Sequence, residues 1–219
     1  MMPKPKLLDL FCGAGGASVG YSRAGFEVTG VDHLPQKNYP FKFIQADAMT
    51  FPLEGFDVIH ASPPCQAYTP VSGRALKGQA GRYPDLIDPV RVRLAGAGVP
   101  YVIENVPGAP LRDPIQLCGS GFGLDVRRHR WFELRGFSAW SVPCAHHWQR
   151  PRFRSLDSRQ KSLATVIGVH GHLNYPGEAE LRNRAMGIDW MTQEELTQAI
   201  PPAYSKFIGE QLRVLEGIA

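Results

Sequence analysis

Short apolar runs that alternate with helix-like segments constrain the fold of this chain more than any other feature. A strand buried on both faces is apolar at nearly every position, whereas a strand with one solvent face alternates. The sequence therefore predicts an α/β fold with a doubly wound, mainly parallel sheet and helices on both faces. The predicted strands are KLLDLF (6–11), EVTGVD (27–32), FKFIQAD (41–47), FDVIHAS (56–62) and YVIENV (101–106).

Helical periodicity fills gaps between these runs and returns late in the sequence. Pro89 either kinks the second predicted helix or marks its start, and a proline pair stands where the last helix begins. GFGL (121–124) and RWFELRG (130–136) are predicted as two more strands, paired as a hairpin at the end of the sheet. Helices are predicted at 18–25, 84–98, 177–188 and 201–218.

Between about residues 138 and 180 the periodicity gives way to Pro, His, Arg and Gly. We therefore divide the chain into a main domain (1–137), an irregular region (138–180) and C-terminal helices that return to the main domain (181–219). No apolar run approaches the roughly 18 residues that span a bilayer, and the N-terminus lacks the apolar core of a signal peptide. We expect a cytoplasmic protein without a membrane partner, whose four cysteines are reduced.

The formal net charge of +4 is mild, but the basic residues are unevenly distributed. From Arg127 to Arg159, Arg and His interleave with Trp and Phe, and acidic residues are sparse. Such a composition is typical of a surface that contacts phosphates and stacks on bases. A solvated basic face is the alternative interpretation.

A glycine-rich loop, Phe11-Cys12-Gly13-Ala14-Gly15-Gly16, follows the first strand. Asp32 ends the second strand, where a carboxylate accepts hydrogen bonds from ribose hydroxyls, and Asp47 ends the third. The carboxyl ends of parallel strands meet at one edge, so these groups outline a nucleoside pocket. The loop does not read GxGxxG and no P-loop lysine follows it, which favours a nucleoside cofactor without an essential phosphate contact, such as S-adenosylmethionine.

The stretch ASPPCQ (61–66) places one thiol directly after a strand and two prolines. Prolines fix their own φ angles and extend the residue before them, so the thiol of Cys65 has a fixed direction. A nucleophile needs such placement, whereas a structural cysteine is usually a small buried hydrophobe. The position therefore favours a reactive thiol.

These motifs resemble those of the DNA (cytosine-5) methyltransferase family. They occur in family order and cover the chain apart from about residues 138–180. The resemblance implies the Rossmann-like fold of S-adenosylmethionine-dependent methyltransferases and makes 138–180 a reduced target-recognition region. The matching segments are DLFCGAGG (9–16), PPCQ (63–66), ENV (104–106), VRRHR (126–130) and AIPPAYSKFIGEQL (199–212).

By this resemblance, the protein transfers a methyl group from S-adenosylmethionine to C5 of cytosine in DNA. Cys65 would add to C6 of the base, Glu104 would hold N3 and N4, and two arginines would stabilise the developing charge. The implied catalytic residues are Cys65, Glu104, Arg128 and Arg130. The implied cofactor-binding residues are Phe11, Gly13, Ala14, Gly15, Gly16, Asp32, His33, Asp47, Ala48 and Pro63. The implied DNA contacts are Gln66, Arg127, Arg152 and Arg154, and no metal ligand is assigned.

Three departures from the family pattern bear on function. Val126 stands where the family has Gln, Gln198 stands where it has Asn, and the recognition region is short. We expect a short recognition sequence, about two to four base pairs. The short region also holds thiols and imidazoles at irregular spacing, so zinc binding by Cys118, Cys144, His146 and His147 is left open.

The implied partner is duplex DNA with the target cytosine flipped out of the helix. The chain is expected to be a monomer from a bacterium or a phage, and a cognate restriction nuclease is left open. Two alternatives remain. One applies the same chemistry to RNA, single-stranded DNA or a nucleotide. The other is a non-catalytic DNA-binding scaffold, against which the intact thiol and cofactor loop speak.

Overall fold

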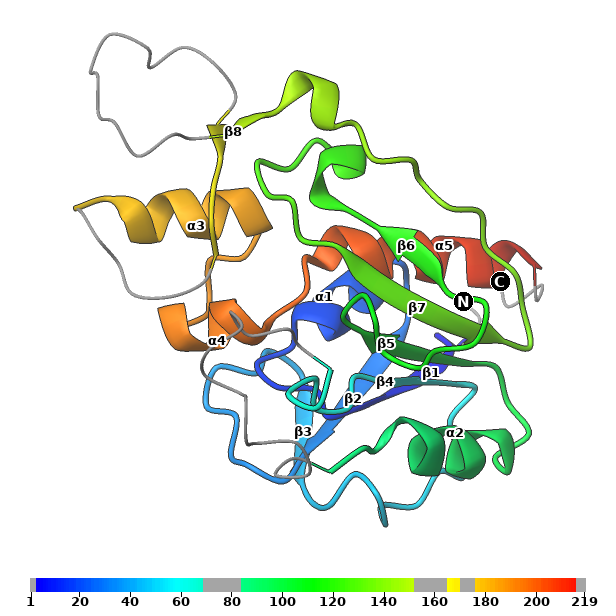
Figure 1. Ribbon diagram of the computed structural model, residues 1–219. Coiled ribbons are helices and arrows are strands. Elements are labelled where there is room, and N and C mark those ends of the chain that lie inside the picture. The colour runs from blue at the N-terminus through cyan, green and yellow to red at the C-terminus, as the bar shows by residue number, and fades with distance from the viewer. Residues whose placement is uncertain (1–2, 69–83, 152–164, 170–175, 216–219) are drawn as a thin grey trace, which may run out of the picture.

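The computed structural model describes residues 3–68, 84–151, 165–169 and 176–215 of the 219-residue chain. A seven-stranded sheet in the order β3-β2-β1-β4-β5-β7-β6 forms its centre (Figure 1). Five strands run parallel, and β7 is antiparallel to both of its neighbours. The predicted α/β fold with a mainly parallel sheet is thus confirmed. The strands are β1 (Lys6–Leu10), β2 (Glu27–Asp32), β3 (Lys42–Gln45), β4 (Val58–Ala61), β5 (Tyr101–Asn105), β6 (Ile115–Leu117) and β7 (Arg130–Arg135).

Helices cover both faces of this sheet, which explains why the inner strands are mainly apolar on both faces. In Figure 1, α1 (Gly16–Arg23) and α5 (Pro202–Leu215) lie above the strands and α2 (Ile87–Ala95) lies below them. Successive residues of one strand point to opposite faces and enter different cores. The core under α1 and α5 receives Leu7, Val58 and Val102, and the core over α2 receives Leu8, Ile59 and Ile103.

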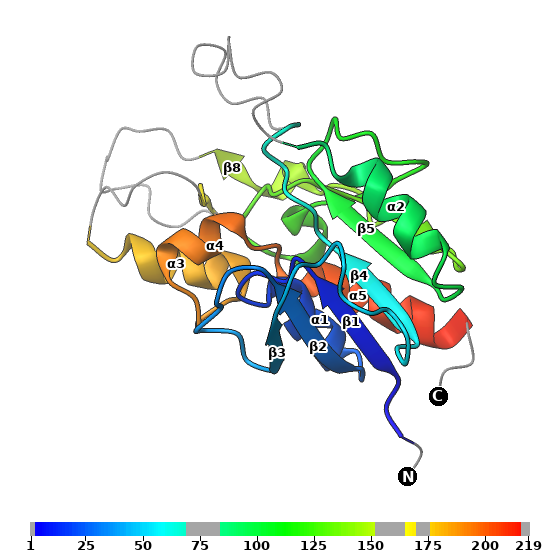
Figure 2. The ribbon, with the colours of Figure 1, turned by 90° about the horizontal axis from the view of Figure 1, so that it is seen from below.

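A third, smaller core lies beside the end of the sheet toward which β1 runs (Figure 2). It joins α3 (Glu178–Met186) and α4 (Gln193–Gln198) to the glycine loop and to the segment before β7. Its members include Ala14, Val126, Ile167, Met186 and Leu196. Next to it, β8 (Arg150–Pro151) and β9 (Thr165–Val166) form a separate two-stranded parallel sheet. The irregular region therefore packs against the edge of the sheet where the parallel strands end.

Two local predictions differ from the structure. GFGL was expected as a strand, but Gly119–Phe122 form a 3-10 turn, η1, and the hairpin partner of β7 is β6. Gly123 has φ 71°, a left-handed conformation that ends the turn and that a strand does not contain. Helix α4 was not predicted, although Thr192 and Glu195 form a capping box at its start. Strands β1 to β5 and β7 lie within the predicted ranges, whereas β6, β8 and β9 lie outside every predicted strand. Pro89 falls in the first turn of α2, where proline is tolerated.

The parallel strands deliver their following loops to one edge of the sheet. Four of these loops line one cavity: the glycine loop after β1, the loop that begins at Asp32, the proline–cysteine loop after β4 and the segment after β5. In the part of the chain that the structure describes, no helix is long and apolar enough to cross a membrane.

Candidate active site

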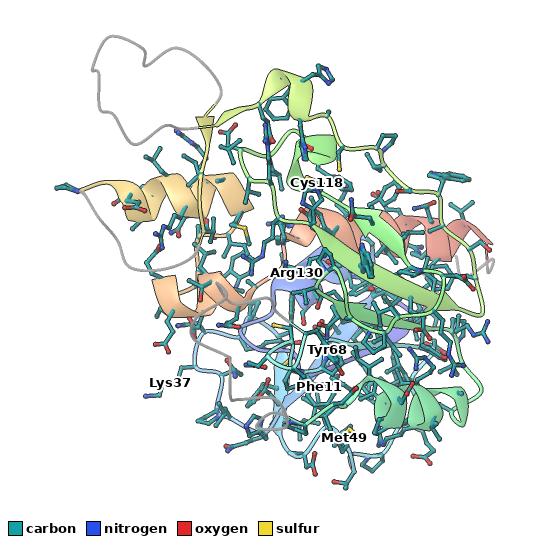
Figure 3. The ribbon with its side chains drawn as sticks, in the orientation of Figure 1. Phe11, Lys37, Met49, Tyr68, Cys118 and Arg130 are labelled. Atoms are coloured by element: carbon teal, nitrogen blue, oxygen red, sulfur yellow. The ribbon has the colours of Figure 1, made fainter. Side chains whose placement is uncertain are left out.

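A cavity of about 470 Å³ opens at the carboxyl ends of the parallel strands. Figure 3 labels two residues of its wall, Phe11 after β1 and Arg130 at the start of β7. The cavity therefore collects groups from segments far apart in the sequence. Of the residues that the sequence predicts for the site, its wall contains Phe11, Gly13, Ala14, Gly16, Asp32, His33, Pro63, Cys65, Gln66, Glu104 and Arg130.

The glycine loop takes a shape that other residues adopt poorly. Gly13 and Gly15 have φ of 48° and 86°, in the left-handed region that glycine enters without a steric penalty. A Cβ at Gly16 would lie 2.6 Å from the carbonyl oxygen of Ile200. The loop can therefore turn sharply and still let the segment before α5 close against it.

Asp32 holds this loop to the end of β2. One carboxylate oxygen accepts a hydrogen bond from the Gly13 N–H at 3.1 Å, and the other accepts one from the Leu34 N–H at 3.0 Å. The imidazole of His33 lies 3.3 Å from the second oxygen. Asp32 is buried and faces the cavity, so it orders the backbone of the predicted cofactor-binding loops.

Cys65 sits in a loop whose backbone is fixed at both sides. The Ser62 N–H donates to the carbonyl of Leu10 at 3.1 Å, and the Asn105 side chain donates to the carbonyl of Pro63 at 2.9 Å. The Tyr68 N–H donates to the carbonyl of Cys65 at 2.9 Å, which closes a turn after the thiol. These bonds tie the loop to β1 and β5, so the half-buried thiol has a defined place on the cavity wall.

Glu104 in β5 and Arg130 at the start of β7 form an ion pair across two neighbouring strands of the cavity wall. The distance between Arg130 Nε and Glu104 Oε1 is 3.1 Å, and both side chains are largely buried. Burial raises the pKa of Glu104 above its ordinary value. The positive charge of Arg130, a hydrogen bond from Ser62 and the charge of Arg128 lower the pKa, but by less than burial raises it. A carboxyl group with a raised pKa keeps its proton to a higher pH than usual, so it is suited to share a proton with a ligand.

Arg128 braces the third core instead of lining the cavity. Its guanidinium donates to the carbonyls of Thr197 at 2.5 Å and Val169 at 3.4 Å. Its own carbonyl accepts a hydrogen bond from the Tyr204 hydroxyl at 2.6 Å. Burial, followed by the charge of Arg130, lowers the pKa of Arg128 to about 9. Arg128 thus connects the segment before β7 to α4 through its side chain and to α5 through its carbonyl group.

Several other predicted site residues lie off the cavity wall. The Asp47 carboxylate is exposed and accepts from the Met49 N–H at 2.8 Å, which stabilises a local turn. Ala48 is buried in the core over α2, and Gly15 packs near Tyr39. The predicted DNA contacts Arg152 and Arg154 lie outside the described residues.

Arg127, another predicted DNA contact, is bonded within the protein. Its guanidinium donates to the side chain of Gln149 at 3.1 Å and to that residue's carbonyl at 2.8 Å. It also donates to the carbonyl of His146 at 3.3 Å. These bonds hold the start of the irregular region and differ from the expected phosphate contact.

Asp9 is a site residue that the sequence analysis missed. It lies within β1, has no exposed surface and forms part of the cavity wall. Ser18 donates to one carboxylate oxygen, and the other oxygen has no hydrogen-bond partner among the described residues. Burial raises the pKa of Asp9 to about 7, although the Ser18 hydrogen bond lowers it, and the charges of Asp32 and Glu104 add to the rise. An acidic residue inside the apolar run KLLDLF was the available signal.

The segment around α4 supplies a wall that the sequence analysis did not predict. The Asn38 side chain donates to Glu195 Oε2 at 2.8 Å, and the Trp190 indole donates to the carbonyl of Ala14 at 2.9 Å. Both bonds join this segment to the loops after β1 and β2. The segment's residues on the cavity wall are Glu194, Glu195, Gln198, Ala199 and Ile200.

Comparison with known proteins adds a local sequence likeness. No protein-family model matches the chain. The type II methyltransferase M.FnuDI of Fusobacterium nucleatum is 36% identical over 74 residues. The match covers 29% of this chain and 22% of that protein, so the chain spans less than a quarter of this relative's length.

Solved structures add a likeness of fold. A DNA modification methyltransferase encoded within an Escherichia coli prophage superposes with a TM-score of 0.65 at 14% identity, covering 98% of this chain and 100% of that chain. Schizosaccharomyces pombe Dnmt2 methyltransferase gives 0.63 at 16% identity, covering 97% and 99%. The methyltransferase EhMeth of Entamoeba histolytica gives 0.57 at 12% identity, covering 98% and 99%. At these identities the comparisons show that the chain shares the fold of methyltransferases.

Proposed function

We propose that this protein transfers a methyl group from S-adenosylmethionine to C5 of cytosine in duplex DNA, through a transient bond between Cys65 and C6 of the base. One observation carries the proposal. A single cavity is lined by the glycine loop, by the Asp32 carboxylate and by Cys65, Glu104 and Arg130. The local likeness to a type II methyltransferase and the shared fold support the same activity.

The cavity wall fits S-adenosylmethionine in shape and in charge. A Cβ at Gly13 would meet nothing within 4 Å, so the loop leaves open space on its inner side. The carboxylate of Asp32 stands at the end of β2, where such a group accepts hydrogen bonds from ribose hydroxyls. Asp9 offers a buried oxygen that has no hydrogen-bond partner within the described part of the chain, which suits a cationic ligand. When bound, S-adenosylmethionine supplies an electrophilic methyl group.

In the proposed reaction, the Cys65 thiolate forms a bond with C6 of cytosine. The electrons of the C5=C6 bond move toward N3, which takes up a proton shared with Glu104, and C5 becomes nucleophilic. Arg130 holds Glu104 in place and stabilises negative charge on the ring. After C5 takes the methyl group and S-adenosylhomocysteine is released, a base takes the C5 proton and Glu104 takes back the N3 proton. The Cys65 sulfur then leaves as thiolate, which restores the C5=C6 double bond. A paired base cannot reach a thiol in a cavity, so the cytosine leaves the duplex.

Covalent trapping on duplex DNA that contains 5-fluorocytosine tests the proposal. Fluorine at C5 cannot leave as a proton does, so the enzyme remains bound to the DNA through Cys65. We expect intact mass of the denatured sample to show protein plus DNA plus one methyl group. Cys65→Ser keeps the size of the side chain and should give no adduct while it still binds cofactor.

Two outcomes would overturn this proposal. A wild-type chain that binds S-adenosylmethionine but forms no adduct on duplex DNA of varied sequence would remove the assigned substrate. Adducts on fluorocytosine RNA or single strands would then transfer the chemistry to those substrates. An adduct that persists in Cys65→Ser would remove the assigned nucleophile.

A further inference from the structure

Two cysteines and two histidines come together outside the cavity, beside the start of β7. One ligand atom from each of Cys118, His129, Cys144 and His146 lies within 4.8 Å of all the others. Cys118 Sγ is 3.2 Å from His146 Nε2, and Cys144 Sγ is 3.4 Å from His129 Nε2. Figure 3 labels Cys118 near Arg130, in agreement with the pairing of Leu117 and Arg130 across β6 and β7.

These distances match the spacing of ligands around one metal ion. Zn–S bonds of about 2.3 Å and Zn–N bonds of about 2.0 Å, arranged as a tetrahedron, separate sulfur and nitrogen ligands by about 3.5 Å. Thiolate and imidazole are the ligand types that zinc selects. We propose that Cys118, His129, Cys144 and His146 bind one zinc ion in a closed structural site.

Neighbouring polar groups form hydrogen bonds to the ligands and hold them in place, as second-layer hydrogen bonds do in known metal sites. The Ser120 hydroxyl donates to Cys118 Sγ at 3.2 Å and accepts from the Ala145 N–H at 3.0 Å. It therefore joins the first and third ligand segments directly. The Gln116 amide donates to Cys144 Sγ at 3.8 Å and accepts from the Trp131 indole at 3.0 Å.

The segment that contains Cys144 and His146 buries few of its own side chains. Of residues 138–149, all of which the structure describes, only Gln149 is buried. This segment nevertheless approaches the turn after β6 closely, since a Cβ at Gly121 would lie 2.7 Å from Val142. A small region without a core gains stability from a metal that ties it to a folded element. Zinc would fasten this segment to the β6–β7 hairpin.

The spacing of the ligands along the chain explains why the sequence alone does not predict the zinc site. Cys118 and His129 flank the turn between β6 and β7, and Cys144-x-His146 follows β7. Neither pair has the C-x₂₋₄-C or H-x₃₋₅-H spacing of common zinc motifs. The hairpin brings Cys118 and His129 together, and the segment after β7 returns Cys144 and His146 to them. His147, considered from the sequence, is exposed and does not belong to the group found among the described residues.

The site also bears on the proposed function. His129 lies between Arg128 and Arg130, so a bound zinc would fix the backbone from which both arginines project. This consequence rests on the proposed function. It predicts that loss of zinc slows adduct formation more than it weakens S-adenosylmethionine binding.

The metal content of the full-length protein, purified with zinc present and dialysed, tests the site directly. We expect one zinc per chain in the wild type and in His147→Ala, the matched control one residue away. His146→Ala should lose the ion, and His146→Cys, which restores a ligand, should retain it. With cobalt in place of zinc, tetrahedral d–d bands and thiolate-to-cobalt absorption are expected.

Three results would overturn the site. The first is a wild-type protein that holds well below one zinc per chain. The second is a His146→Ala variant with the same metal content as the wild type. The third is an intact mass that shows a Cys118–Cys144 disulfide. His146→Cys keeps the test decisive if His146→Ala fails to fold. Metal content is read without DNA or S-adenosylmethionine, so a failed trapping experiment leaves this result unaffected.

Discussion

At the scale of single residues, the carboxylate of Asp9 occupies a place where an ionised group is costly. It has no exposed surface, its pKa is raised to about 7 mainly by burial, and one oxygen lacks a partner among the described residues. A folded-state pKa above the ordinary 3.8 means that the folded protein keeps a proton that the unfolded chain has released. The contribution of Asp9 to stability is therefore greatest below pH 3.8, is lost as the pH rises to about 7, and does not change further above that.

Asp9→Asn should stabilise the free protein at pH 8 by roughly 2–4 kcal/mol, because the amide has the same shape and no charge to desolvate. Ser18 can donate to the amide oxygen as it does to the carboxylate. Urea unfolding of both proteins from pH 4 to pH 8 measures the difference, which should grow with pH. A difference that is constant across this range would show that Asp9 does not titrate as described.

The site residues that the sequence predicts differ from those that it misses in whether their partners are near in the chain or in the sheet order. Cys65 and Glu104 stand in loops or strand ends whose order along the chain already implies a shared edge. The bracing role of Arg128 depends on the carbonyls of Val169 and Thr197, which no sequence pattern places beside it. Partners that are far apart in sequence and bonded through the backbone leave no local signal.

At the scale of elements, α1 and α5 approach each other most closely at Gly20. A Cβ at Gly20 would lie 2.0 Å from Ser205 Oγ and 2.2 Å from the carbonyl oxygen of Pro202. The helices are also joined by a hydrogen bond from Ser205 Oγ to the carbonyl of Ala17 at 2.8 Å. Backbone atoms cannot yield as a flexible side chain does, so any substituent must push the helices apart.

Gly20→Ala should therefore destabilise the protein by about 1–3 kcal/mol or more, despite the higher helix propensity of alanine. Gly96→Ala is the matched control, since Gly96 has φ −72° and its Cβ would meet Arg93 O at 3.5 Å, an ordinary contact. Thermal unfolding of both variants compares them. Equal midpoints would show that the two helices have room to separate.

The elements that were predicted well are those with a core on both faces. The sequences of β1, β2, β4 and β5 are mainly apolar because their side chains enter the two cores alternately, one on each face of the sheet. The turn η1 was mistaken for a strand because GFGL has apolar residues at alternate positions, while its glycines serve a tight turn. The short α4 carries one buried residue, Leu196, so its apolar periodicity is weak.

At the scale of the whole molecule, the cavity joins early, middle and late parts of the sequence. Phe11, Cys65 and Ile200 all lie on its wall. A ligand in this cavity contacts segments that separate only when the molecule unfolds globally. S-adenosylmethionine should therefore stabilise the whole fold and not a single loop.

We expect S-adenosylmethionine at 100 times its dissociation constant to raise the free energy of unfolding by about 2.7 kcal/mol. Tryptophan fluorescence and far-ultraviolet circular dichroism should report the same shift in urea midpoint. Asp32→Ala, which frees the Gly13 loop, should show a smaller shift at the same ligand concentration. An unchanged wild-type midpoint would contradict the cofactor assignment.

The sheet and the position of its functional edge could be predicted from the sequence, but the arrangement of the irregular region could not. The proposed zinc ligands Cys144 and His146, and the Val169 carbonyl that Arg128 bonds, come from segments without hydrophobic periodicity. Their places are set by hydrogen bonds to Ser120 and Arg128 and not by a repeating apolar face.

The pairing of α1 with α5 also has a consequence for synthesis on the ribosome. Ala17 and Ser205, which bond across this pair, are separated by 188 positions along the chain. The core that both helices cover stays open until the later helix has left the exit tunnel, and contacts of such long range form slowly. The nascent chain therefore exposes the apolar face of α1 and an unfinished cavity until α5 has been synthesised and docks.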